Sequence, residues 1–380
     1  MNDYSYTYNY LNMQNLNNNN NEINNIINNE KKQNSLCRIY NYGFNCYMNS
    51  GLQIISRCDK LIEWLKISNF PKEECPFFNI IKFTLNEILN SNVFDPKNFI
   101  KYFASLNKDF PPNTQNCSQL FIKTVLSNIN DEIINYLTKH KIDNNLIYNN
   151  YEPNINENDS YKNFLTSNRV FPQSLPYSYF SGIIKTESTG ICNVCGEVKK
   201  YSFMDFFDQH MYLDTINDSQ TDFKNVLKEN LGYPIKVKSS CPICKNKLDF
   251  KDISKIIKLP EILVFTIERY IGETNRIPII PNEIIELREY VENNIKDTTY
   301  ELFAINIRFG YSNQFGHQIC QIKKENNWYI LNDMNTPVKG NINEYNRNTY
   351  GLFYKKIDNN KYFQSYSQYK SSNNYSFCEC

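Results

Sequence analysis

The sequence of 380 residues has little alanine, glycine, histidine or net charge. Its only alanines are Ala104 and Ala304, and it holds 11 glycines and three histidines. Lys and Arg total 41 and Asp and Glu total 40, so a net charge of +1 gives no global electrostatic reason to bind nucleic acid or an anionic membrane. No apolar run approaches the roughly 20 residues that a membrane-spanning helix needs. Any partner must therefore be recognised by a local surface.

The sequence also lacks signals for export or membrane anchoring. Its amino-terminal part has no basic segment followed by an apolar one, which is the pattern of a secretory signal. The last four residues, 377–380, lack the cysteine that a prenylation box requires at its first position. Twelve cysteines are too few for a disulfide scaffold of this length. We expect an intracellular protein, cytoplasmic or nuclear, in a reducing compartment.

The composition indicates a folded domain between two tails. Hydrophobic residues make up 41% and aromatic residues 15% of the chain, which is enough for a substantial core. Residues 1–34 contain 14 asparagines and show no apolar period, so we expect a disordered tail there. A second tail is expected over residues 358–380, which leaves residues 35–357 for the folded domain.

The apolar spacing predicts helices first and strands afterwards. Phe121, Val125 and Ile129 recur at helical spacing. From about Ser181 the pattern changes to short strands such as SGIIKTES, EILVFTIERY and YELFAINIRF. The polar stretch 142–168 interrupts the pattern and predicts a surface insertion. This order is typical of an α+β protein in which a helical part precedes an antiparallel sheet.

Histidine is the usual general base near neutral pH, and only three candidates exist. His140 lies in a charged run and His210 follows polar residues, so we expect both at the surface. His317 follows Gly316 and begins a predicted strand, which places its ring at a sheet edge beside a loop. His317 is therefore the candidate base, although the spacing alone is equally compatible with an ordinary strand residue.

The candidate nucleophile is Cys46, in the segment NYGFNCYMNSGLQ at residues 41–53. A glycine-containing turn brings Cys46 to the start of a predicted helix, where unpaired backbone N–H groups and the helix dipole favour the thiolate form. The same N–H groups, with a nearby amide such as Asn41, suit a developing oxyanion. The alternative is a buried structural cysteine.

Two Cys-x2-Cys pairs, Cys192 with Cys195 and Cys241 with Cys244, form a second candidate site. Four thiolates in two such turns suit tetrahedral Zn²⁺. Residues 196–240 separate the pairs, which is longer than in an ordinary zinc ribbon, so accidental pairs and redox thiols remain alternatives. Four thiolates leave no open coordination position, and we therefore expect one structural zinc ion and no organic cofactor.

Four segments together resemble the ubiquitin-specific protease family, whose members are papain-like cysteine deubiquitinases. NYGFNCYMNSGLQ is similar to the family's Cys box, and FGHQICQIKKENNWYILND at 315–333 is similar to its His box. LPEILVFTIERY at 259–270 and TYGLFYKK at 349–356 resemble two further strands of the family. The segments occur in family order. The resemblance implies a papain-like fold with a helical thumb, an antiparallel-sheet palm and zinc-binding fingers at about residues 186–260.

The resemblance also implies roles for individual residues. Cys46 stands at the family's nucleophile and His317 at its base. Asn332 matches the third member, which orients the imidazole, and Asp333 matches a second acidic position that can support it. Asn41 matches the side chain of the oxyanion hole. In this family a four-cysteine site tips the fingers, which cradle the body of ubiquitin.

The sequence departs from the family where ubiquitin's tail is bound. A family motif near Q-Q-D-A-x-E-F aligns with residues 115–121, so that Cys117 and Leu120 replace two acidic residues. In the family these carboxylates help to hold the arginines of the tail. Near the base, Phe315 replaces a glycine and Gln318 replaces a tyrosine. The resemblance thus implies a ubiquitin-directed isopeptidase whose tail recognition is altered.

Ubiquitin and ubiquitinated proteins are the partners that the resemblance implies. Two other functions stay open at this point. One is an inert ubiquitin-binding scaffold that keeps the fold without turnover. The other is a protease for another ubiquitin-like modifier, which the missing acidic pair favours. The sequence does not define the target protein, the chain linkage or the oligomeric state.

Overall fold

The computed structural model describes residues 36–111, 113–142, 146–147, 151–168, 172–216, 218–270, 274–310 and 316–357. The two predicted tails, residues 1–34 and 358–380, lie outside the described residues, as does Phe315. Within the described part, helices dominate the first half and strands the second, as the sequence predicts. No helix of this part is both long and apolar enough to cross a membrane.

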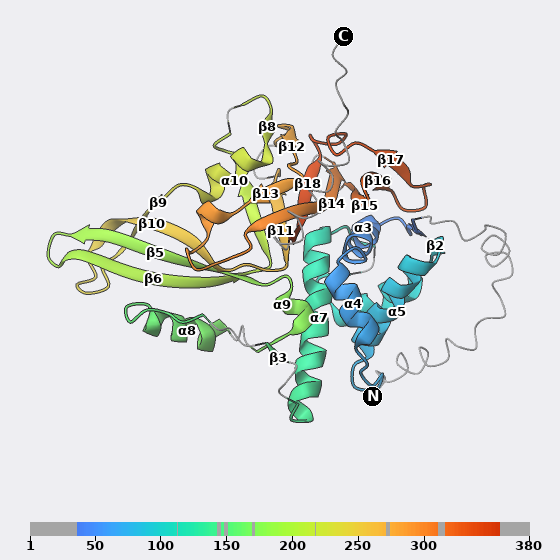
Figure 1. The fold of residues 1–380 in the computed structure, drawn as a ribbon, viewed down its shortest axis with the longest axis horizontal. Coiled ribbons are helices and arrows are strands. Elements are labelled where there is room, and N and C mark those ends of the chain that lie inside the picture. Colours follow the sequence, from blue (N-terminus) through green and yellow to red (C-terminus); the bar gives the residue numbers. More distant parts are fainter. Residues whose placement is uncertain are drawn as a thin grey trace, which may run out of the picture.

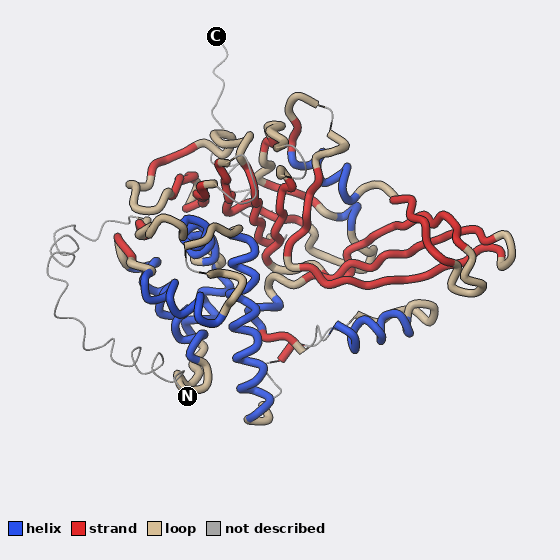
Figure 2. The backbone as a smooth tube through the Cα atoms, turned by 180° about the vertical axis from the view of Figure 1, so that it is seen from behind, coloured by secondary structure: helices blue, strands red, loops and turns tan. Residues whose placement is uncertain are grey.

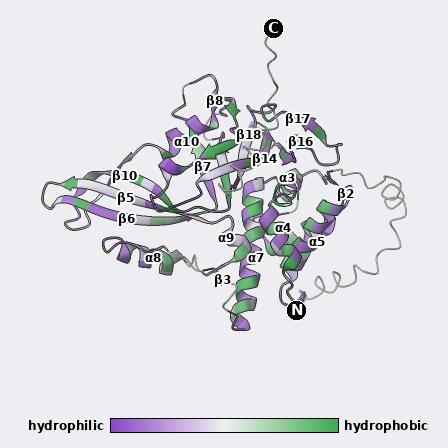
Figure 3. Cartoon of the chain, in the orientation of Figure 1, coloured by the Kyte–Doolittle hydropathy of each residue, from purple (hydrophilic) through white to green (hydrophobic). Residues whose placement is uncertain are grey.

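Five helices, here called the thumb helices, lie on one side of the molecule (Figure 1). They are α3 (Cys46–Ile55), α4 (Asp59–Ile67), α5 (Pro76–Asn90), α6 (Lys97–Leu106) and α7 (Ser118–Lys139). In α7 the buried residues Phe121, Val125 and Ile129 recur every four positions and therefore form one buried face. Figure 3 shows the resulting alternation of hydrophobic and hydrophilic residues along α7.

The main sheet, here called the palm sheet, follows later in the chain. Its strands lie in the order β17, β16, β15, β14, β18, β11 and β7, with β13 paired to β14. They are β7 (Asp208–Tyr212), β11 (Ile262–Glu268), β13 (Ile284–Glu286), β14 (Thr299–Phe309), β15 (His317–Lys324), β16 (Asn327–Leu331), β17 (Val338–Gly340) and β18 (Thr349–Lys356). The sheet is antiparallel except at one edge, where β7 and β11 pair in parallel. The structure thus has the predicted antiparallel sheet and adds one parallel pair at this edge, because a long excursion separates β7 from β11 and returns the chain in the same direction.

That excursion contributes half of a second sheet, here called the finger sheet. Its strands β5 (Gly182–Cys192), β6 (Gly196–Phe206), β9 (Ile235–Ser240) and β10 (Lys247–Lys258) pair in the order β6, β5, β10, β9. The finger sheet projects away from the thumb helices as a long arm (Figures 1 and 2). Both Cys-x2-Cys pairs lie at turns that begin or end its strands.

The predicted surface insertion at residues 142–168 contains more structure than a polar loop. It forms β3 (Leu146–Ile147) and α8 (Asn158–Asn168), followed by β4 (Gln173–Ser174) and α9 (Leu175–Ser178). Tyr161 and Phe164 of α8 are buried against Ile183 and Phe203 of the finger sheet. These two aromatic residues are three positions apart and so share one helix face, a signal that the surrounding asparagines obscure.

The remaining elements are short and connect the larger units. They are β1 (Arg38–Ile39), β2 (Val93–Phe94), β8 (Thr221–Asp222), α10 (Phe223–Leu231), β12 (Ile279–Ile280) and the 3₁₀ helix η2 (Arg288–Tyr290). Helix α10 packs against the palm sheet on the face that carries Phe265 and Tyr354.

The thumb helices pack on the opposite face of the palm sheet and share one core with it. Leu52 of α3, Phe121 of α7 and Ile322 of β15 all belong to this core. Helices α3 and α7 meet at Gly51, where an added Cβ would lie 2.5 Å from the ring of Phe121. A glycine is therefore required for this approach, which brings the start of α3 against β15.

Candidate active site

Cys46 is the first residue of α3 and is 2% exposed. The preceding turn contains Gly43 at φ +103°, a conformation that favours glycine. No side chain caps the helix. Instead Asn45 stabilises the turn, because its Oδ1 accepts from the Tyr42 N–H at 2.6 Å and its Nδ2 donates to the Tyr40 carbonyl at 3.0 Å. The first N–H groups of α3 therefore have no side-chain acceptor from the N-cap residue.

His317 begins β15, and its side chain interacts with the Cys46 thiol. Its Nε2 lies 2.8 Å from Oδ1 of Asn332, the residue that follows β16. Since a carbonyl oxygen can only accept, Nε2 is the donor in this bond and Nδ1 remains available for proton exchange. The contact with Cys46 and the bond to Asn332 raise the pKa of His317 to about 9, against burial, which lowers it. The His317 imidazole can thus accept the proton of the Cys46 thiol.

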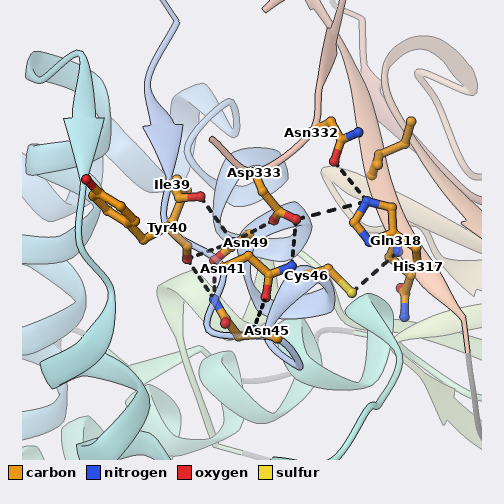
Figure 4. Close-up of polar contacts among 12 residues, drawn as sticks. Ile39, Tyr40, Asn41, Asn45, Cys46, Asn49, His317, Gln318, Asn332 and Asp333 are labelled. Atoms are coloured by element: carbon orange, nitrogen blue, oxygen red, sulfur yellow. Dashed lines mark hydrogen bonds and ion pairs between the residues drawn. The ribbon is translucent and has the colours of Figure 1, made fainter. Parts of the chain in front are cut away.

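Asp333, next to Asn332 in the chain, links the palm sheet to the residues around the start of α3 through its carboxylate. Its Oδ2 accepts from Nδ2 of Asn41 and its Oδ1 accepts from Nδ2 of Asn49, each at 2.7 Å. Its Oδ2 also lies 4.0 Å from Nε2 of His317, farther than Asn332 does. The carboxylate thus anchors two amides more directly than it supports the imidazole (Figure 4).

Asn41 lies beside Cys46 in Figure 4. Its Oδ1 accepts from the Gly43 N–H at 2.8 Å, which fixes the plane of the amide. An amide group carries two N–H bonds, so the contact with Asp333 leaves one for a bound oxyanion. The role that the resemblance implies for Asn41 stays a prediction, and the geometry is compatible with it.

Asn45 and Asn49 are not among the residues to which the sequence assigned a functional role. Asn49 is one helical turn after Cys46 and reaches Asp333 and the Tyr40 carbonyl, at 2.7 and 3.1 Å. Both asparagines lie inside the segment that carries the family resemblance. Only that resemblance could have drawn attention to them, since asparagine is frequent throughout this chain.

The other two histidines are at the surface, as predicted. His140 contacts Glu74, with Nε2 3.1 Å from Oε2, and His210 contacts Glu268 and Asp208. Their side chains are 38% and 49% exposed. Neither joins the group around Cys46.

The four cysteines of the two Cys-x2-Cys pairs come together at the tip of the finger sheet. The sulfur atoms of Cys192, Cys195, Cys241 and Cys244 all lie within 4.8 Å of one another. A tetrahedral zinc site with Zn–S bonds of about 2.3 Å has sulfur atoms about 3.8 Å apart, which this cluster fits. Backbone N–H groups of Val194 and Cys195 lower the pKa of Cys192 to about 7, whereas the contact with the Cys244 thiol raises the pKa of Cys195 to about 12.

The segment that departs from the family begins α7. Cys117 is the N-cap residue, and its Sγ accepts from the Leu120 N–H at 3.2 Å. Leu120 itself is 44% exposed. The two positions thus lie on the first turn of α7, next to the start of β15.

A cysteine at a helix start, paired with an imidazole that an asparagine orients, is the arrangement of papain-like cysteine hydrolases. The α+β architecture, with the cysteine on a helix and the histidine on a sheet, agrees with that class.

Comparison with known proteins identifies the family. The family model for ubiquitin carboxyl-terminal hydrolase matches residues 37–354. "Probable ubiquitin carboxyl-terminal hydrolase 4" of Schizosaccharomyces pombe is 23% identical over 370 residues, which cover 83% of this chain and 58% of the relative. "Ubiquitin carboxyl-terminal hydrolase 12" of Salmo salar is 24% identical over 310 residues, which cover 78% of this chain and 79% of the relative. The chain belongs to the ubiquitin carboxyl-terminal hydrolase family.

The match does not extend over the whole of every relative. The chain spans 58% of the fission yeast protein and 22% of "Ubiquitin carboxyl-terminal hydrolase 23" of Arabidopsis thaliana, to which it is 25% identical over 201 residues. The residues that the family model matches include Cys46 and His317.

Proposed function

We propose that this protein is a thiol-dependent deubiquitinase, which hydrolyses the isopeptide or peptide bond after the C-terminal glycine of ubiquitin. The observation that carries the proposal is the arrangement of Cys46, His317 and Asn332 within a chain of this family. Ubiquitin and ubiquitinated proteins are the proposed partners.

The mechanism follows from the proton positions in the site. The Cys46 thiolate attacks the glycine carbonyl carbon, and the resulting oxyanion accepts hydrogen bonds from the backbone at the start of α3 and from Asn41. The His317 imidazolium gives its proton to the departing lysine amine, which leaves a thioester on Cys46. Water then attacks the thioester while His317 takes its proton, and the products are the ubiquitin carboxylate and the regenerated thiolate. Asn332 keeps the imidazole in the required tautomer throughout.

The proposal is tested with a fluorophore attached to the C-terminus of ubiquitin, under reducing conditions. We expect the purified protein to release the fluorophore and to be captured covalently at Cys46 by a ubiquitin probe with an electrophilic terminus. A folded protein that does neither is instead an inert scaffold. Release from a conjugate of another ubiquitin-like modifier, without release from ubiquitin, indicates the alternative specificity that Cys117 and Leu120 favour.

Acidic side chains at positions 117 and 120 should improve recognition of the C-terminal tail of ubiquitin. Cys117→Asp with Leu120→Glu should lower KM for the ubiquitin conjugate about tenfold at low salt, because a charge-assisted contact contributes about 1.5–3 kcal/mol. The helix start is preserved, since a carboxylate oxygen can replace Sγ as the acceptor for the Leu120 N–H. The matched control is the neutral pair Cys117→Asn with Leu120→Gln. Equal KM values for the charged and neutral pairs, at low and high salt, contradict the prediction.

We further propose that the four-cysteine cluster binds one structural zinc ion. Zinc would cross-link the two turns at the finger tip. It would supply no chemistry at Cys46, because Cys46 begins α3 and Figure 1 shows α3 on the other side of α7 from the finger sheet. Cys192→Ala should remove the metal and weaken binding of ubiquitin.

The expected result is one zinc per chain in the unaltered protein and less than one in Cys192→Ala, measured by elemental analysis. KM for the ubiquitin conjugate should rise and the thermal midpoint should fall, because structural zinc stabilises such turns strongly, by about 10–16 kcal/mol in small peptides. The control is Cys58→Ala, which removes a buried thiol outside the cluster. An unaltered protein that holds no zinc, or a Cys192→Ala variant that keeps the zinc content, midpoint and KM of the unaltered protein, contradicts this assignment.

A further inference from the structure

The start of β15 is tied to the start of α7 by a set of buried polar contacts. Gln318, the residue after His317, is 2% exposed, and Ser118, the first residue of α7, is fully buried. Buried polar groups are normally paired, so a buried glutamine beside an active site needs its partners identified.

The Gln318 side chain contacts the chain on both sides of Cys117. Its Oε1 accepts from the Ser118 N–H at 3.2 Å and lies 2.9 Å from the Ser118 Oγ, and its Nε2 donates to the Asn116 carbonyl at 2.5 Å. The Ser118 N–H is one of the helix donors that have no partner within the helix. Gln318 thus pairs two backbone groups, the Ser118 N–H at the start of α7 and the Asn116 carbonyl before it.

The same contacts reach the nucleophile. The Gln318 backbone N–H points at the Cys46 sulfur at 3.4 Å, as Figure 4 shows. The Ser118 hydroxyl also lies 2.9 Å from the carbonyl of Tyr47, the residue after Cys46. A hydroxyl has one hydrogen, so it donates either to Tyr47 or to Gln318. The Ser118 N–H keeps the Gln318 oxygen paired in both cases.

His317 is held on its other side as well. The N–H of Gly316 donates to Oε1 of Gln115 at 2.5 Å. Both sequence neighbours of His317 are therefore anchored to the segment that leads into α7. Reacting groups tolerate little displacement from their aligned positions. The two anchors therefore fix the position of His317 relative to Cys46.

We propose that Gln318 is a positioning residue, which clamps the strand carrying His317 to the start of α7 and thereby aligns His317 with Cys46. The proposal rests on the proposed function for its biological meaning, because the clamp serves the thiol chemistry. The clamp bridges elements that are about 200 residues apart in the chain, and it adds a tie to α7 beside the pairing of His317 and Gln318 with β14.

The test compares Gln318→Met with Gln321→Met. Methionine keeps the length of the side chain and removes its hydrogen bonds. Gln321 lies on the same strand, is 1% exposed, and donates to the Asn341 carbonyl at 2.9 Å, away from α7. Both variants should lower the thermal midpoint, but only Gln318→Met should lower kcat, by about 10- to 100-fold, with KM nearly unchanged.

A second readout does not depend on ubiquitin. The rate at which iodoacetamide alkylates Cys46, followed by mass spectrometry of its peptide, should fall in Gln318→Met and stay unchanged in Gln321→Met. If the unaltered protein cleaves no ubiquitin conjugate, the proposed function fails while the alkylation rates still decide the role of Gln318.

If Gln318→Met does not fold, Gln318→Glu replaces it, because a carboxylate keeps the acceptor for the Ser118 N–H and removes the N–H that donates to the Asn116 carbonyl. We then expect a smaller fall in kcat and in alkylation rate, again at constant KM. The proposal is overturned if the folded variant keeps both rates, or if Gln321→Met lowers them equally.

Discussion

Cys46→Ala and His317→Ala should each abolish hydrolysis of the ubiquitin conjugate while leaving the protein folded. Removing a nucleophile or its base costs on the order of 10⁶-fold in kcat in a comparable catalytic triad. The two side chains act as a pair, because the contact with Cys46 is the largest cause that raises the pKa of His317. Loss of either side chain therefore removes the pair. Initial rates, with circular dichroism as the check on folding, provide the measurement.

Matched controls exist in the same chain. Cys58→Ala removes another buried thiol, which lies just after α3, and His140→Ala removes a histidine at the surface. Both should keep the rate of the unaltered protein. Activity that persists in folded Cys46→Ala or His317→Ala refutes the assigned roles.

Asp333→Ala should lower kcat by about 10²-fold, although Asp333 makes no hydrogen bond to His317. Its carboxylate instead accepts from Asn41 and Asn49, and losing an oxyanion donor typically costs about 10²–10³-fold. Asp333→Asn should also be impaired, because an amide offers one acceptor oxygen where the two asparagines need two. Leaving a buried N–H unpaired costs about 1–3 kcal/mol.

The pH profile separates this anchoring role from support of the imidazole. The leaving amine needs the His317 imidazolium, so kcat/KM should fall as the pH rises through about 9, the pKa of His317. Asn332→Ala should move this fall to lower pH, because the bond from Asn332 raises the pKa. Asp333→Ala should move it less, since its charge is a weaker contribution. If Asp333→Ala moves the fall as far as Asn332→Ala does, Asp333 acts mainly on the imidazole.

The helix and strand order could be predicted because the periodicities are strong. The spacing of Phe121, Val125 and Ile129 suffices for α7, and the continuous apolar run of β11 suffices for a buried strand. The helix α8 was missed because only two aromatic residues define its buried face among asparagines. The parallel pairing of β7 with β11 was missed because strand direction depends on the path of the chain between them.

The sequence identified some active-site residues and not others. Cys46 and His317 could be named because few residue types perform their chemistry and their motifs are specific. Asn45 and Asn49 have no chemical signature of their own, and the bond from Asn49 to Asp333 exists only after α3 meets the turn that follows β16. The clamp made by Gln318 is of the same kind, because its partners precede it by about 200 residues.

The sequence by itself determined the family resemblance, the α+β class and the identity of the reactive groups. These depend on local patterns and on the chemistry of single side chains. The tertiary structure decided how those groups are held: which amide orients His317, which carboxylate anchors Asn41, and which glutamine joins β15 to α7. Such contacts are pairings between distant segments, and their geometry follows from the packing of the thumb helices on the palm sheet.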